Sequence, residues 1–414
     1  MPFTSISVDR LRVSDEWLRR GRKSDAWATV GSSISKNDRF VEAVYPLYAS
    51  RAKGAYLWDV DGNRYIDYIL GYGTIILGHA DDRVTDAVVA ELRSGNCLSP
   101  FWRSVQVELT ETLTTVIPDA EMAFLMRTGS DATSGAVRLA RIFTGRSKVV
   151  RWGYQGWHDW CAPPLGVPES VQRETLTFRY NDFDSLEAVL KAHRGDVACV
   201  VMMPFELEPP RPGGLQEVRA LAHHHGALFV LDEMRSGFRM ALGGAQQFFE
   251  VRADIATFSK AMANGHAISA VVGRADVLSC MARTQMVSAF YTSAPEMAAS
   301  MATISILRDT PALSDVWAMG RLFQDGLRAQ VSEYGVSAEV QGYPPCPYLQ
   351  FTYADPEVRE AARIAFYSQT TNNGILLHPS HHWYVSASHT RADIEATLAV
   401  CRKGFEAARA ALQC

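Results

Sequence analysis

The sequence predicts an α/β protein built on a mostly parallel β-sheet. From about Arg83 to Leu307, apolar runs of strand length alternate with segments of helical periodicity, which is the pattern of consecutive βαβ units. One of these runs, residues 227–232, is unbroken apolar sequence that ends in Asp232. A strand of this kind is buried on both faces and brings its last residue to the carboxyl edge of the sheet, where open α/β sheets bind their ligands.

Composition narrows the class of protein. The 414 residues are 47% hydrophobic, which is enough for a large core and for more than one structural unit. The formal net charge of −4 gives no electrostatic basis for binding nucleic acid or an anionic membrane. No apolar run reaches membrane-spanning length, and the amino terminus lacks the pattern of a secretory signal. The seven cysteines are odd in number and form no C-x-x-C pair, so we expect a reducing, cytoplasmic location.

The two ends of the chain differ from its middle. A charged, helix-favouring segment over 9–23 is expected to lie as an arm over a neighbouring domain or subunit. Two alternating strands around Asp61-Gly-Asn, within residues 54–68, predict a β-hairpin. From about Arg308 the pattern becomes helix, strands, helix, strands and a last helix from about Ala392.

These patterns divide the chain into three parts. We expect an arm and hairpin over residues 1–75, a large domain over 76–307, and a small carboxy-terminal domain over 308–414 with which the hairpin packs.

A second short segment, Thr257–Gly265, follows Asp232 in the chain and contains Lys260. A lysine that bonds to an aldehyde and a carboxylate that faces a ring nitrogen are the pair that an enzyme using pyridoxal 5′-phosphate (PLP) needs. Ionised Asp232 would keep the ring nitrogen protonated, so that the ring draws negative charge away from the carbon that bears the amine. Burial should lower the pKa of Lys260 from ~10.4 and let it carry protons. Taken alone, a carboxylate at a strand end also suits a helix cap.

A phosphate-binding turn is predicted between a strand and a helix over Phe124–Arg141. Small residues there would expose backbone N–H groups at the helix amino terminus, which favours a phosphate. Gly129 and Ser130 are the candidates, although a simple Ser/Asp helix cap would produce the same letters.

The segment 148–160 is unusually aromatic. Its cluster of aromatic and acidic residues could cover sugar faces or bind ammonium groups, and plain packing of the loop is an equal alternative. The run His223–His225 is not predicted to bind a metal, because consecutive histidines do not converge on one helix face and Gly226 marks a helix end.

These motifs resemble the class III PLP-dependent aminotransferases, and Ser236–Gln246 resembles their glutamate-1-semialdehyde aminomutase branch. The resemblance extends from about Gly54 to Thr390 and implies the fold-type I architecture, PLP as cofactor, and a homodimer whose active sites each use two chains. It assigns residues to five roles: Lys260 and Asp232 to catalysis, Gly129 and Ser130 to the phosphate, Tyr154 to stacking on the cofactor ring, Thr292 to the phosphate of the other subunit, and Tyr72 to substrate contact. For Thr292 a helix cap is the alternative, and for Tyr72 a core or interface tyrosine. The aromatic and acidic cluster itself, and not the resemblance, supplies three further candidates for substrate contact: Trp157, His158 and Asp159. The chain departs from the family at Gln155, where a histidine is usual, and at Met203, where a glutamate is common.

The resemblance implies an aminotransferase. The expected reaction moves an amino group from an amino acid, L-glutamate, to an oxidised amino-sugar carbonyl, as in aminoglycoside 6′-aminotransferases. An aminomutase stays open, and so does an epimerase, which would need a second acid or base opposite Lys260. A catalytically silent cofactor-binding regulator is a further alternative, against which the presence of both Lys260 and Asp232 speaks.

Overall fold

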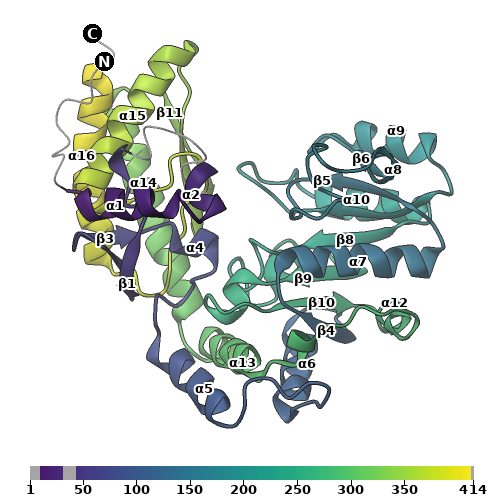
Figure 1. The fold of residues 1–414 in the computed structure, drawn as a ribbon. Coiled ribbons are helices and arrows are strands. Elements are labelled where there is room, and N and C mark those ends of the chain that lie inside the picture. The colour runs from purple at the N-terminus through teal and green to yellow at the C-terminus, as the bar shows by residue number, and fades with distance from the viewer. Residues whose placement is uncertain (1–9, 31–42, 412–414) are drawn as a thin grey trace. The chain divides into compact units, whose positions relative to one another are not determined.

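The computed structural model describes residues 10–30 and 43–411, so the predicted arm lies partly outside the described residues. The chain forms two compact units (Figure 1). The central unit is Asp82–Leu313, and the terminal unit combines Met1–Asp81 with Ser314–Cys414. The sequence predicts domain boundaries between residues 75 and 76 and between residues 307 and 308. No helix in the described residues is long and apolar enough to cross a membrane.

The central unit contains a seven-stranded sheet. Its strands are β4 (Met122–Met126), β5 (Lys148–Trp152), β6 (Thr175–Thr177), β7 (Val197–Met202), β8 (Leu228–Asp232), β9 (Ile255–Phe258) and β10 (Ser269–Gly273). They lie in the order β4-β10-β9-β8-β7-β5-β6. All neighbours pair in parallel except β10, which is antiparallel to both β4 and β9. The predicted mostly parallel sheet is confirmed.

Helices cover both faces of this sheet because alternate strand residues point to opposite sides. Val149 and Val230 pack with α7 (Gly129–Thr144) in one apolar cluster, whereas Val150 and Phe229 pack in another. That second cluster includes residues of α9 (Phe183–Ala192) and α10 (Gly214–His224). Strands β7 and β8 are buried along their whole length, which is why their sequences are apolar up to Asp232, the last residue of β8.

The central unit also contains shorter helices and the largely buried helix α13. They are α5 (Asp82–Arg93), α6 (Ser104–Val116), α8 (Glu169–Gln172), α11 (Gly244–Phe248), α12 (Ala275–Leu278) and α13 (Ala294–Asp309), with the 3₁₀ helices η1 (Lys260–Ala263), η2 (Ser279–Arg283) and η3 (Ala289–Thr292).

The terminal unit holds the predicted hairpin. Strands β2 (Tyr56–Asp59) and β3 (Arg64–Asp67) pair antiparallel, and β1 (Ala49–Lys53) and the short β13 (Ile375–Leu376) complete a four-stranded sheet. The carboxylate of Asp59 shapes the turn, because Oδ1 accepts hydrogen bonds from the N–H groups of Asp61 at 3.0 Å and Asn63 at 2.8 Å. The other elements are α1 (Arg12–Gly21), α2 (Ala26–Val30), α4 (Leu70–Gly73), α14 (Ala312–Tyr334), β11 (Ala338–Tyr343), β12 (Cys346–Phe351), α15 (Pro356–Asn372) and α16 (Arg391–Ala411).

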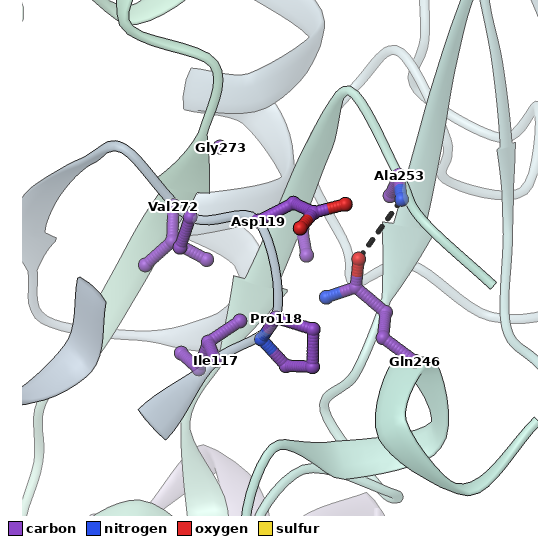
Figure 2. A pocket seen from close by; sticks show the side chains of 9 residues that line it. Ile117, Pro118, Asp119, Gln246, Ala253, Val272 and Gly273 are labelled. Carbon is purple, nitrogen blue, oxygen red and sulfur yellow. Dashed lines mark hydrogen bonds between the residues drawn. The ribbon is translucent and has the colours of Figure 1, made fainter. Parts of the chain in front are cut away.

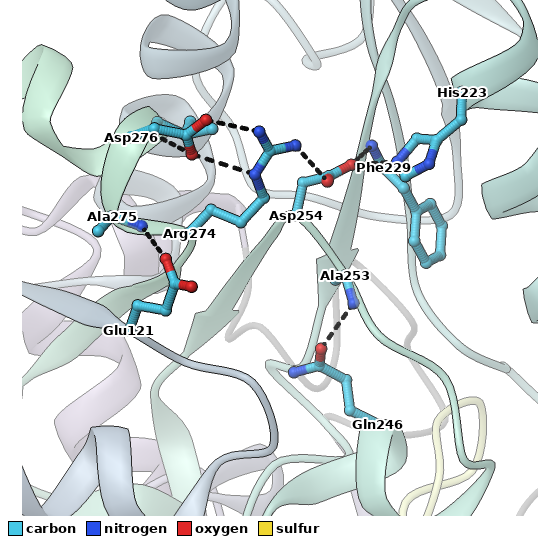
Figure 3. Close-up of polar contacts among 10 residues, drawn as sticks. Glu121, His223, Phe229, Gln246, Ala253, Asp254, Arg274, Ala275 and Asp276 are labelled. Atoms are coloured by element: carbon cyan, nitrogen blue, oxygen red, sulfur yellow. Dashed lines mark hydrogen bonds and ion pairs between the residues drawn. The ribbon is translucent and has the colours of Figure 1, made fainter.

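A buried carboxylate anchors the amino-terminal end of β9 (Figure 3). Asp254 Oδ2 accepts hydrogen bonds from the N–H of Phe229 at 2.8 Å and pairs with His223 Nε2 at 2.7 Å, while Oδ1 accepts from Arg274 Nη1 at 3.0 Å. His223, the first residue of the histidine run, therefore ties the end of α10 to the edge of the sheet. Among the described residues there is no group of three or more His, Cys, Asp or Glu that could hold a metal ion.

A small pocket lies beside this anchor (Figure 2). It is lined by Ile117, Pro118, Asp119, Gln246 and neighbouring residues of β9 and β10. Because these residues precede β4 and β9 or end the antiparallel β10, the pocket belongs to the edge of the sheet opposite the carboxyl ends of the parallel strands.

Candidate active site

The topology brings four sequence motifs of the central unit to one edge. Strands β5, β8 and β9 are parallel, and β4 runs in the same direction because the antiparallel β10 separates it from β9. Their carboxyl ends therefore lie at the same side of the sheet, which is where open α/β sheets bind ligands. The residues that follow these ends are the predicted ones: Gly129 and Ser130 after β4, Tyr154 after β5, Asp232 at the end of β8, and Lys260 after β9.

Asp232 and Lys260 stand on adjacent strands. Asp232 is 1% exposed and pairs in register with Thr257 of β9, three residues before the lysine. Lys260 begins η1 with a backbone φ of +46°. This left-handed conformation costs a residue other than glycine roughly 1–2 kcal/mol. Backbone strain of this kind gathers at functional sites, where the surrounding structure enforces it.

Burial shifts the pKa values of both groups toward neutrality. It raises the pKa of Asp232 to about 6, although the N–H of Met234 and the positive charge of Lys260 oppose the shift. Burial also lowers the pKa of Lys260 to about 8, and the guanidinium groups of Arg235 and Arg239 add to this effect while Asp232 opposes it. A large fraction of Lys260 is therefore a neutral amine near pH 8, which is the form that attacks a carbonyl carbon.

One oxygen of Asp232 fits the nitrogen of a protonated ring. Oδ1 accepts a hydrogen bond from Met234 N at 3.0 Å, whereas Oδ2 is buried and has no hydrogen-bond partner within the described residues. A buried carboxylate oxygen without a donor is costly and calls for a missing group. A cationic N–H would supply both the proton and the opposite charge.

The turn after β4 combines a helix cap with open N–H groups. Thr128 caps α7: its Oγ1 accepts from the N–H of Asp131 at 3.2 Å, and Asp131 Oδ2 accepts from the N–H of Thr128 at 2.8 Å. The described part of the chain supplies no acceptor for the backbone N–H of Gly129 or Ser130. The loop after β5 lies against this turn, since a Cβ on Gly156, whose φ is +119°, would meet Ser130 Oγ at 2.4 Å. These open groups suit a phosphate.

Gln155 fixes the loop that carries Tyr154. Its side chain is buried, with Oε1 accepting from Arg151 Nη1 at 2.7 Å and Nε2 donating to the carbonyl oxygen of Trp152 at 2.7 Å. Its own carbonyl oxygen accepts from Thr133 Oγ1 on α7 at 2.6 Å. The ring of Tyr154, in contrast, is 68% exposed. The glutamine at this position therefore holds the loop and leaves the tyrosine ring open at the sheet edge.

The three predicted substrate residues of the same loop divide into two kinds. Trp157 is 71% exposed and Asp159 is also exposed. His158 instead shares a hydrogen bond with Ser134 Oγ through Nδ1 at 2.7 Å, and Trp160 Nε1 donates to the same hydroxyl at 2.9 Å. His158 and Trp160 thus tie the loop to α7, while Trp157 and Asp159 extend into solvent.

Thr292 and Tyr72 lie in different surroundings. Thr292 ends η3, and its Oγ1 donates to the carbonyl oxygen of Ala289 at 3.3 Å. An antiparallel bridge between Cys97 and Ser293, and a hydrogen bond from Ser293 Oγ to the carbonyl oxygen of Asn96 at 3.2 Å, bring the end of η3 beside residues 96–97. Tyr72 belongs to the terminal unit, where its hydroxyl pairs with His378 Nε2 at 3.2 Å; every other predicted site residue belongs to the central unit.

The sequence prediction missed Glu233 and the two arginines that act on Lys260. All three belong to the motif that follows β8, and Glu233 and Arg239 are fully buried. A buried loop rich in charge, directly after a strand that ends in an acid, was the available signal. The position of the family glutamate is occupied by the buried side chain of Met203.

A seven-stranded sheet with a buried acid and a lysine at its carboxyl edge defines a fold-type I PLP-dependent enzyme. The chain belongs to the class III aminotransferase family, whose model it matches over residues 39–161 and 164–390.

Two relatives and one solved structure show which members of that family the chain resembles. The chain is 38% identical to the 3-aminobutyryl-CoA aminotransferase of Cloacimonas acidaminovorans, over 90% of this chain and 92% of that protein. It is 33% identical to the glutamate-1-semialdehyde 2,1-aminomutase of Hyperthermus butylicus, over 88% and 93%. The structure of the FumI protein of Sphingopyxis sp. MTA144 with PLP superimposes with a TM-score of 0.89 at 30% identity and covers 96% of both chains. The family and this neighbour identify PLP as the cofactor.

Proposed function

We propose that this class III enzyme moves an amino group from L-glutamate to the carbonyl carbon of an oxidised amino sugar. The observation that carries the catalytic part is the pair formed by Asp232, with one buried oxygen lacking a partner in the described residues, and Lys260, whose pKa is lowered to about 8. Bound PLP supplies an electron-withdrawing ring that accepts negative charge from the carbon bearing the amine.

Each proposed role is supported by one observed feature of the site. Neutral Lys260 would hold the aldehyde of the cofactor and, as a free amine, would be the base that takes the proton from the amine-bearing carbon of the substrate. Asp232 keeps the ring nitrogen protonated through Oδ2. The N–H groups of Gly129 and Ser130 hold the phosphate, and the exposed ring of Tyr154 covers one face of the cofactor.

We propose a homodimer in which Thr292 reaches the phosphate of the partner subunit. The surface beside η3 supports a second copy as its occupant, because several large apolar side chains are exposed there on two segments joined by the Cys97–Ser293 bridge: Leu98, Phe101, Trp102, Val287 and Phe290. Phe101 and Trp102 are 73% and 78% exposed. Contiguous exposed apolar side chains mark interaction surfaces.

The acceptor part of the proposal depends on the loop after β5. The exposed ring of Trp157 could cover an apolar sugar face, and the exposed carboxylate of Asp159 could pair with an ammonium group of an amino sugar. Tyr72, in the terminal unit, and His158, in the central unit, stay predicted substrate contacts. We place the enzyme in the cytoplasm, a proposal supported by the six described cysteines, all of which are free thiols.

A second candidate is an aminomutase, favoured by the 33% identity to the glutamate-1-semialdehyde enzyme. An aminotransferase moves the amino group from one substrate molecule to another, whereas an aminomutase moves it to a different carbon of the same molecule.

The first experiment is therefore a half-reaction. The PLP-loaded protein is mixed with L-glutamate alone, and the visible spectrum and released 2-oxoglutarate are followed, with Lys260→Ala as control. One equivalent of 2-oxoglutarate per site supports the aminotransferase with this donor. No 2-oxoglutarate, together with conversion of glutamate semialdehyde, replaces it by the mutase. Turnover of the aminated enzyme with a 3-oxoacyl thioester but no oxidised amino sugar would refute the proposed acceptor.

A further inference from the structure

Glu233, the neighbour of Asp232, is a fully buried carboxylate with no role in the proposed reaction. Three donors from one loop converge on it. Oε2 accepts hydrogen bonds from Ser236 Oγ and from the N–H of Ala245 at 2.8 Å, and Oε1 accepts from the N–H of Gln246 at 2.8 Å. The loop Ser236–Gln246 thus leaves the end of β8 and returns to close on a carboxylate at its own start.

The loop is built around this carboxylate. Gly244 has a φ of +77°, and a Cβ there would lie 2.7–2.8 Å from the carboxyl atoms of Glu233. Only glycine lets the backbone approach so closely in this conformation. Gln246 links the loop to the segment that leads into β9, because its Oε1 accepts a hydrogen bond from the N–H of Ala253 at 2.9 Å (Figures 2 and 3). The carboxylate therefore fixes both the loop and its connection to the lysine-bearing strand.

Two cations belong to this segment of the chain. Arg235 precedes it directly, and Arg239 lies within it and is fully buried. The charged groups that act on Lys260 are Arg235, Asp232 and Arg239, and Glu233 is not among them. Burial raises the pKa of Glu233 to about 7, whereas its three donors and the neighbouring Asp232 act more weakly on it. Glu233 can therefore influence the lysine only indirectly, through the loop or through Asp232, with which it is coupled.

We propose that Glu233 is a positioning residue: it holds the loop Ser236–Gln246 folded and so keeps the guanidinium groups of Arg235 and Arg239 close enough to Lys260 to favour the neutral amine. This inference rests on the proposed role of Lys260 as the residue that bonds to the cofactor. A cation near the lysine disfavours its charged form, and the neutral amine is the nucleophile.

The test measures the lysine in the cofactor-free protein. The rate at which the apoenzyme captures PLP is recorded by absorbance against pH, and its midpoint reports the ionisation of Lys260. The wild-type midpoint is expected near pH 8. In Glu233→Gln the amide nitrogen cannot accept a hydrogen bond, so one or two donors of the loop lose their partner. We expect the midpoint to rise by about one pH unit, in keeping with a like charge moved away.

Two further variants isolate the cause. Arg235→Met removes one cation directly and should raise the midpoint in the same direction, and the double variant with Glu233→Gln should show less than the sum of the two shifts, because both act on one interaction. Glu217→Gln, an exposed glutamate in the first turn of α10, is the matched control and should leave the midpoint unchanged.

The outcomes separate this inference from the proposed function. An unchanged midpoint in Glu233→Gln, with a native near-ultraviolet circular dichroism spectrum, overturns the positioning role. If that variant does not fold, Ser236→Ala removes a single donor, and a smaller upward shift supports the role while no shift overturns it. Capture of PLP by Lys260→Ala at the wild-type rate would instead overturn the role of the lysine itself.

Discussion

Replacing Asp232 by asparagine should stabilise the cofactor-free protein and impair the enzyme. The pKa of Asp232 is about 6 in the folded chain, against about 4 when unfolded. A rise of about two pKa units corresponds to about 3 kcal/mol of lost stability above pH 6. The sign follows from proton binding: the folded state holds the proton more tightly, so stability falls as the pH rises from about 4 to about 6 and then stays constant.

Asparagine removes this penalty with little change of shape. Its Oδ1 can still accept from Met234 N, and its amide occupies the place of the carboxylate oxygen that lacks a partner in the described residues. We expect a gain in the free energy of unfolding of up to about 3 kcal/mol at pH 8, reduced because charged Lys260 loses the attraction of Asp232. At pH 4.5 the gain should largely disappear.

The assay is urea unfolding of the apoprotein at the two pH values, combined with the glutamate half-reaction of the loaded enzyme. Loss of the charge beside the ring nitrogen should slow that half-reaction by roughly 10²-fold to 10³-fold, as for other groups aimed at developing charge. An asparagine variant that is less stable at pH 8, or equally stabilised at both pH values, would refute the reasoning about burial. A wild-type half-reaction rate would remove Asp232 from the cofactor site.

Three further substitutions test the rest of the site. Tyr154→Ala should weaken PLP binding by about tenfold, because aromatic stacking contributes roughly 0.5–1.5 kcal/mol beyond burial, whereas Tyr154→Phe should retain the affinity measured by titration of the apoprotein. Gly156→Ala should weaken PLP retention, measured by dialysis, since a Cβ at φ +119° would meet Ser130 at 2.4 Å and push the loop off the phosphate turn; unchanged retention would contradict that contact. Thr292→Val should weaken retention only in the partner's site, which mixed dimers can show; an effect confined to the mutated chain would contradict the cross-subunit role.

Apolar runs were sufficient to predict the parallel core, because strands buried on both faces, such as β7 and β8, consist of apolar residues apart from the functional Asp232 at the end of β8. The direction of β10 was not predicted, although chain length contained the signal. Only residues 259–268 separate β9 from β10, and a parallel return needs a crossover of a dozen residues or more. The run of residues 264–265, Asn-Gly with both φ values positive, allows the tight reversal that an antiparallel pair requires.

Polar contacts between residues far apart in the chain could not be predicted from the sequence. His223 lies far along the chain from Asp254, and Gln155 from Thr133, so no local period couples them. Their partners depend on which helix packs on which strand. The histidine run could thus be assigned to a helix end, but its contact with a buried carboxylate could not. The same holds for Glu233, whose donors return to it only once the loop Ser236–Gln246 has folded.

The two interpretations of the Thr128–Asp131 turn, helix cap or phosphate site, are not exclusive in the structure. The capping box uses the N–H of Asp131 and the N–H of Thr128 itself. It therefore fixes the start of α7 without consuming the N–H groups of Gly129 and Ser130, for which the described residues supply no acceptor. Because the capping box fixes the start of α7, the N–H groups of Gly129 and Ser130 point in a defined direction. Binding of a phosphate then costs less conformational entropy, because these donors are already ordered. The cap is thus a condition for the phosphate site and not an alternative to it.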